Sequence, residues 1–195
     1  MDMYEITKGT EEQRQQVREW LYGLDYLSED KQEKVITAWL TAWQNSVYDN
    51  LEDMAYSSLA PSYTLKSHVN EVTKFGILLA ENAVKEWGYE TDFDELVQIL
   101  ILHDVDKPYL YVIEDGNTVK SEYAQQIQHG VLGAMILKDL GFSDKVISTV
   151  ATHATNSPFH GNTFEAYVLH YADLFSSDHA LRLDNVKPFY QVRLM

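Results

Sequence analysis

Apolar residues recur at three- and four-residue steps through most of this chain, which is the spacing of amphipathic helices. Polar capping residues and glycines separate the apolar stretches. Together they predict helices over about 10–21, 28–44, 63–87, 93–104, 121–140, 143–155 and 163–181. Between 110 and 120, Asp115-Gly116 lies among β-prone residues and predicts a small hairpin or an extended loop. The pattern predicts an all-α protein.

The same pattern divides the chain into three parts. Residues 1–61 hold the first two helices and a mixed connector containing Pro61, and we interpret them as an accessory cap without recognisable chemistry. Residues 62–182 form the helical core, and residues 183–195 are expected to pack as an arm on one compact unit. The aromatic N-terminal helices would either cover the core or form a homodimer contact.

The helix over 93–104 ends in an unusual group of polar residues. It is apolar from Leu96 to Leu102 except at Gln98, and it runs directly into His103 and Asp104. Asp106-Lys107-Pro108 follow at once. Burying a charge is costly unless it is paired or bound to a metal, so we expect a compensating partner here.

Other polar residues face inward elsewhere in the chain. His68, for example, lies on the apolar stripe of the 63–87 helix. We expect each such residue on a different helix, apart from one adjacent pair, so that packed helices can bring them to one point. The set contains His68, His103, Asp104, His129, His153 and Asp173. The chain has no cysteine, and histidine with aspartate suits Mn, Fe, Zn or Mg.

Charge and hydropathy reduce the number of functions that the chain could have. A formal net charge of -15 argues against binding to nucleic acid or to an anionic membrane surface. It is compatible with a small anionic substrate, because bound cations reverse the field inside a pocket. No apolar run approaches the roughly 20 residues of a membrane span. The first residues lack the features of a signal peptide, so we expect a soluble cytoplasmic protein.

These polar residues resemble those of the HD-domain superfamily of metal-dependent phosphohydrolases, which is named after its His-Asp doublet. The resemblance covers residues 62–182 and implies an HD-like helical bundle with N-terminal accessory helices. His68, His103-Asp104 and Asp173 match the ligands shared by the superfamily. His129 and His153 match the two histidines added in its two-metal members, which implies two divalent ions.

The resemblance also implies a reaction. It would be hydrolysis of a small phosphate ester, such as a nucleotide or another phosphorylated metabolite, by a metal-activated water. Asp104 would bridge both ions, and Lys107 would bind a phosphate oxygen during catalysis. Asp106 stands where glycine is usual, and its role is open between a base, a partner of a ligand and an exposed residue. A Gly-Tyr-Pro signature is absent, which disfavours cyclic dinucleotides.

Two other functions stay open at this point. Some relatives with the same ligands are di-iron oxygenases, and a lysine after the doublet occurs in those too. A non-catalytic sensor with a structural metal is the third alternative. Among the remaining histidines, we expect His170 to orient Asp173 or to be structural, and His160 and His179 to lie on the surface.

Overall fold

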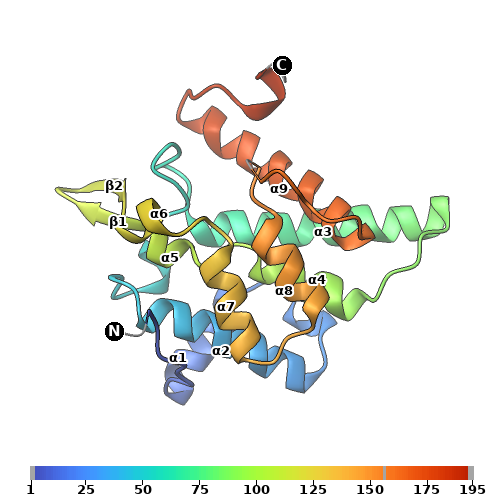
Figure 1. The fold of residues 1–195 in the computed structure, drawn as a ribbon, viewed down its shortest axis with the longest axis horizontal. Coiled ribbons are helices and arrows are strands. Elements are labelled where there is room, and N and C mark those ends of the chain that lie inside the picture. The colour runs from blue at the N-terminus through green and yellow to red at the C-terminus, as the bar shows by residue number, and fades with distance from the viewer. Residues whose placement is uncertain (1–2, 156, 193–195) are drawn as a thin grey trace.

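The computed structural model describes residues 3–155 and 157–192, and in this part of the chain it shows a helical bundle with one hairpin (Figure 1). The all-α prediction is confirmed. Short 3₁₀ turns cover Leu24–Tyr26, Leu51–Asp53 and Phe189–Gln191. The regular elements are α1 (Glu11–Trp20), α2 (Glu29–Gln44), α3 (Leu65–Trp87), α4 (Phe93–Leu102), α5 (Lys107–Leu110), β1 (Tyr111–Glu114), β2 (Asn117–Lys120), α6 (Tyr123–Gln126), α7 (Val131–Asp139), α8 (Asp144–Thr152) and α9 (Phe164–Leu183).

Local signals account for most of these boundaries. Thr10 and Gln13 form the predicted capping box of α1. The N-cap Thr64 accepts a hydrogen bond from Ser67 N, and α3 ends at Gly88 in the left-handed region. Ser28 occupies the N-cap position of α2 as predicted, but its side chain makes no capping hydrogen bond.

The predicted hairpin is present. Strands β1 and β2 pair antiparallel, and Glu114 pairs with Asn117 at the closed end. Asp115 and Gly116 between them both have positive φ, which fits a two-residue turn of the tight hairpin type. The hairpin projects from the left of the bundle in Figure 1.

Helix α4 lies at the centre of the bundle. Every residue from Leu96 to Leu102 is buried, and α4 packs against α2, α3, α8 and α9. Full burial of its six aliphatic side chains contributes roughly 10 to 18 kcal/mol of transfer free energy, which is an upper bound. The apolar run therefore fixes the doublet at its C-terminal end, His103-Asp104, in the interior.

The helix predicted over 121–140 is interrupted, so this prediction is wrong. Helix α6 ends at Gln126 and α7 begins at Val131. Gly130 between them has φ +89, and a Cβ there would lie 2.5 Å from Val150 O. The Gly130 N–H donates to Asp106 Oδ2 at 2.6 Å. The close approach to α8 and this side-chain bond replace the helical pattern with a turn.

The N-terminal helices contribute to the same hydrophobic core as the later ones. Val17, Trp20 and Trp39 belong to one buried cluster with Leu100 and Leu132. The domain boundaries at 61 and 182 remain predictions. Up to residue 192 the C-terminal arm is tied to α9, because the N–H groups of Phe189 and Tyr190 donate to Asp178. Residues 193–195 of the arm and residues 1–2 of the cap lie outside the description.

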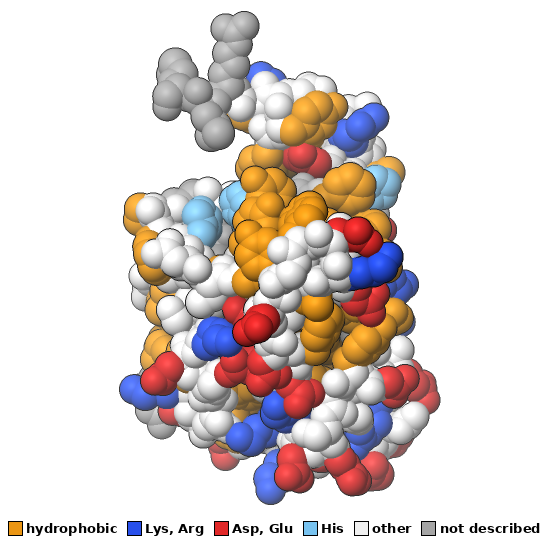
Figure 2. Space-filling model, turned by 90° about the vertical axis from the view of Figure 1, so that its right-hand side faces the viewer, with side chains coloured by type: hydrophobic (Ala, Val, Ile, Leu, Met, Phe, Trp, Pro, Cys, Tyr) orange, Lys and Arg blue, Asp and Glu red, His pale blue; other side chains and the backbone are white. Residues whose placement is uncertain are grey.

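The surface is uneven in character. Figure 2 shows hydrophobic side chains gathered in the upper half of one face, with acidic and basic side chains mixed below them. On α9, the exposed Tyr167, Tyr171 and Phe175 follow at four-residue steps and so share one side of the helix. The predicted homodimer contact stays a prediction. None of the helices in the described residues has the length and apolar character that a membrane span needs.

Candidate metal centre

The four histidines of the sequence-predicted set surround Asp104, and Asp173 joins them through a contact with His68. Asp104 Oδ2 lies 3.1 Å from His68 Nε2 and 3.4 Å from His103 Nε2. Its other oxygen, Oδ1, lies 3.0 Å from His129 Nε2 and 3.5 Å from His153 Nε2. One carboxylate therefore faces two pairs of histidines, one pair on each oxygen.

Asp173 completes the group from α9. Its Oδ1 lies 3.3 Å from His68 Nε2, and Ser177 one turn later donates to the same oxygen at 3.0 Å. His170 was expected to orient Asp173 or to be structural, and among the described residues no hydrogen bond joins it to Asp173. The centroid of the His170 ring instead lies 5.0 Å from that of the His160 ring. Burial is the main cause that lowers the pKa of His170, and the neighbouring His160 lowers it further.

His160 and His179, both expected on the surface, differ in solvent exposure. His179 is exposed, whereas His160 is half-buried and its Nδ1 is fully enclosed. The surface prediction is therefore confirmed for His179 and only in part for His160. Its contact with His170 across the loop before α9 could not be seen from local composition.

Helix ends supply more of the site than the sequence pattern suggested. His68 and Asp173 lie within α3 and α9, but His103 and His153 are the C-caps of α4 and α8. His129 lies in the turn before α7. The prediction of one ligand per helix is wrong for these three, because a residue at a helix end can reach the centre while the helix itself packs beside it.

Each of the four imidazoles is held from outside through Nδ1. His103 Nδ1 donates to Leu100 O at 2.9 Å, and His153 Nδ1 donates to Val150 O at 2.7 Å. Both bonds satisfy a carbonyl in the last turn of a helix, which would otherwise lack a partner. Because a carbonyl only accepts, a proton must sit on Nδ1, so a neutral imidazole in this position presents the lone pair of Nε2 to the centre.

Asp106 accepts the corresponding hydrogen bond from His129, which supports one of the roles left open for it. Asp106 is fully buried, and its Oδ1 accepts from His129 Nδ1 at 2.9 Å. Burial opposes ionisation of this carboxyl, but His129 and the Gly130 N–H outweigh burial and lower the pKa of Asp106. It is the partner of a candidate ligand rather than an exposed residue.

Lys107 is buried beside the carboxylate at the centre. Its Nζ lies 3.3 Å from Asp104 Oδ2. Burial opposes both charges, but their mutual attraction outweighs it. The pKa of Asp104 is held well below its usual range, and the pKa of Lys107 lies above its usual value. Both groups are therefore ionised at neutral pH.

The sequence analysis missed Tyr56, which lies in the connector read as free of chemistry. Its ring centroid is 4.1 Å from that of His68, and Lys107 Nζ lies 3.8 Å above its ring. The Tyr56 hydroxyl is 2.7 Å from Ser177 Oγ. Tyr56 covers the site and stabilises the lysine charge by a cation–π contact. No local signal distinguishes it from the other 12 of the chain's 13 tyrosines.

The donor set fits a divalent metal. Ligand atoms of His68, His103 and Asp104 lie within 4.8 Å of one another, as do those of Asp104, His129 and His153. Asp104 Oδ2 is buried yet makes no hydrogen bond within the described part of the chain. Imidazole nitrogens that face inward and a carboxylate oxygen without a hydrogen bond are groups that a borderline or hard cation binds.

Comparison with known proteins agrees with this geometry. The chain is 33% identical over 110 residues to a dihydroneopterin 2',3'-cyclic phosphate phosphodiesterase of Methanocaldococcus jannaschii. The match covers 56% of this chain and 44% of that relative, so the chain spans less than half of the relative's length. No solved structure matches the chain. The profile of the family described as HD domain matches residues 66–178, more than half of the sequence. The chain therefore belongs to the HD domain family.

Proposed function

We propose that this protein is a metal-dependent phosphohydrolase that cleaves a small phosphate ester. The observation that carries the proposal is the convergence of four inward-facing imidazole Nε2 atoms on the two oxygens of Asp104. Membership of the HD family and the phosphodiesterase activity named for the relative support the same reaction class.

We assign the ligands to two divalent ions that share Asp104. One ion would be held by His68, His103, Asp104 and Asp173, and the other by Asp104, His129 and His153. Bound together, two such ions lower the pKa of a shared water and stabilise the attacking and leaving oxygens of an in-line displacement.

The protein's own groups would complete the reaction. Lys107 contributes a positive charge beside Asp104, where it can bind a non-bridging phosphate oxygen. Tyr56 and the residues around it exclude water from the side of the site formed by His68 and Lys107. In the hydrolysis, a water oxygen forms the new P–O bond, the ester P–O bond breaks, and the leaving oxygen takes up a proton.

The relative's name suggests which esters to test first. That protein acts on a cyclic phosphate of a small molecule. We propose a small cyclic phosphodiester as the first substrate class for this chain. Its product would be a phosphomonoester.

The test combines metal content with an assay. Protein purified without chelator and kept from air is analysed for metals per chain, and a 2',3'-cyclic nucleotide and bis(p-nitrophenyl) phosphate serve as probes under nitrogen. We expect near two equivalents of metal and ester cleavage that chelation abolishes and added metal restores. Failure to bind metal after reloading would overturn the proposal. Iron with oxygen consumption and no ester cleavage would favour the oxygenase alternative.

Asp106 gives a prediction specific to the second ion. Asp106→Asn keeps the shape of the side chain but replaces one acceptor oxygen with an N–H₂ donor. Either His129 or Gly130 then loses its acceptor, and we expect the second metal equivalent to bind roughly 10- to 100-fold more weakly. Calorimetric titration checks this against Asp115→Asn in the hairpin turn. Unchanged binding of both equivalents would show that Asp106 does not support His129.

A further inference from the structure

His68 differs from the other three histidines in what holds its Nδ1. The acceptors at His103, His129 and His153 are two carbonyls and one carboxylate, which cannot donate. His68 Nδ1 instead lies 3.1 Å from the hydroxyl of Ser176, within the fully buried part of α9. A hydroxyl can donate or accept, so by itself it does not decide which ring nitrogen of His68 carries the proton.

A carboxylate on the other side of Ser176 removes this ambiguity. Ser176 Oγ donates to Glu71 Oε2 at 3.2 Å. A serine has one hydroxyl proton, and when Glu71 accepts it, the oxygen can only accept from His68. The Tyr63 hydroxyl is 3.4 Å from Ser176 Oγ and can donate to the second lone pair of the serine oxygen, which leaves the serine proton for Glu71.

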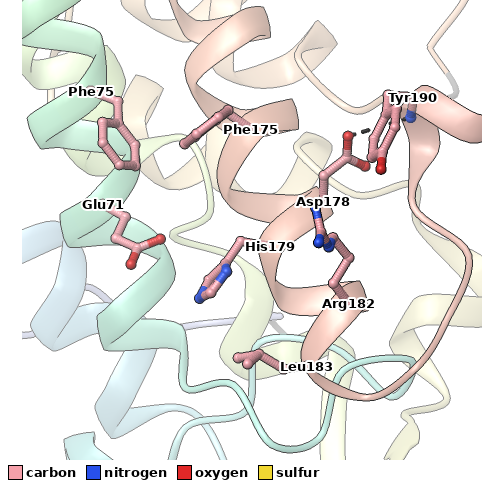
Figure 3. Close-up of a pocket in the computed structure, with 8 residues that line it drawn as sticks. All are labelled: Glu71, Phe75, Phe175, Asp178, His179, Arg182, Leu183 and Tyr190. Atoms are coloured by element: carbon pink, nitrogen blue, oxygen red, sulfur yellow. Dashed lines mark hydrogen bonds between the residues drawn. The ribbon is translucent and has the colours of Figure 1, made fainter.

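Glu71 is placed at the edge of the core. It lies on α3 one turn after His68, and it lines a groove of about 700 Å³ between α3 and α9 (Figure 3). The hydrogen bonds thus run from this groove through Ser176 to the imidazole that faces Asp104. Glu71 is too far along this chain of bonds to touch a metal or a substrate there.

We propose that Glu71 and Ser176 are positioning residues that fix the proton of His68 on Nδ1 and leave Nε2 free to bind metal. Glu71 sets the direction of the serine hydroxyl, and the serine oxygen accepts from the imidazole. The proposal rests on the proposed function only for its metal; the position of the proton can be measured without one.

The test removes the acceptor and follows both the proton and the metal. Glu71→Met keeps a long side chain at this half-buried position but frees the serine to donate towards His68. In metal-stripped protein, Asp104 and Asp173 also face His68 Nε2, so the readout is the proton on Nδ1. We expect ¹⁵N NMR to show Nδ1 of His68 fully protonated in the wild type and partly deprotonated in the variant. Titration with Mn²⁺ should show that the ion assigned to His68 binds about tenfold more weakly in the variant. Loss of a group that orients a ligand costs about 10- to 100-fold in metal affinity, and this is the lower end of that range.

Controls separate positioning from general damage. Glu81→Met makes the same change at an exposed site of α3 and should leave both readouts unchanged. Ser176→Ala removes the hydroxyl and should weaken binding of the ion assigned to His68. Asp106→Asn should weaken binding of the ion assigned to His129. If Glu71→Met keeps the wild-type tautomer and binds Mn²⁺ within twofold of it, the inference is wrong while the proposed function stands. A wild type that binds no metal overturns the proposed function, and the tautomer alone then decides the role of Glu71.

Discussion

Asp104→Ala is expected to lose both metal ions and all measurable ester hydrolysis. The two oxygens of Asp104 face different pairs of histidines, so a single substitution removes a ligand from each proposed ion. Loss of one group that stabilises a transition state costs about 10²- to 10³-fold in rate. We expect a loss greater than about 10³-fold here, measured as kcat with the cyclic substrate and as metal per chain.

The fold of this variant must be checked separately. Lys107 would be left buried without its carboxylate, and breaking a buried ion pair costs about 3 to 5 kcal/mol of unfolding free energy. Asp104→Asn retains the shape of the side chain and serves as the second variant. Asp49→Ala, at an exposed site, is the matched control. Full activity in a folded Asp104→Ala protein would show that the site is assigned wrongly.

Lys107→Met should keep the metals and lose rate. The methionine preserves most of the buried stem. It removes the charged Nζ, which lies over the Tyr56 ring and which we assign to a phosphate oxygen. Its kcat is expected to fall about 10²- to 10³-fold, the cost of one charge-stabilising donor. Metal content should remain near that of the wild type.

The comparison for Lys107 is a lysine outside the site. Lys120 ends β2 on the exposed hairpin, and Lys120→Ala should behave as the wild type. If Lys107→Met cleaves the substrate at the wild-type rate, the lysine has no role at the phosphate and its charge serves only to balance Asp104.

Hydrophobic spacing predicted the helices that build the interior because burial there follows the helical period. The run from Leu96 to Leu102 is buried throughout, and it places the doublet at the end of α4 as expected. His68 is likewise buried on the stripe that contains Leu65 and Val72. For such residues the local pattern and the tertiary structure agree.

The pattern failed where one distant contact decides the backbone. The break before α7 depends on Asp106 accepting from Gly130, and Tyr56 reaches Lys107 from a connector without periodicity. Neither contact follows from the residues near it in sequence. His103 and His153 were placed within helices because sequence spacing does not separate a C-cap from the last residue of a helix. In the structure both are C-caps whose side chains bond to a carbonyl three residues earlier.

The hydrogen bond between His68 and Ser176 joins positions 108 residues apart and has a consequence for biosynthesis. The chain leaves the ribosome N-terminus first, and a domain generally folds as a unit. Until α9 has emerged, His68 lacks both Ser176 and Asp173, while His103, Asp104, His129 and His153 are already present. The set of candidate ligands that contains His68 and Asp173 is therefore complete only when translation is nearly finished.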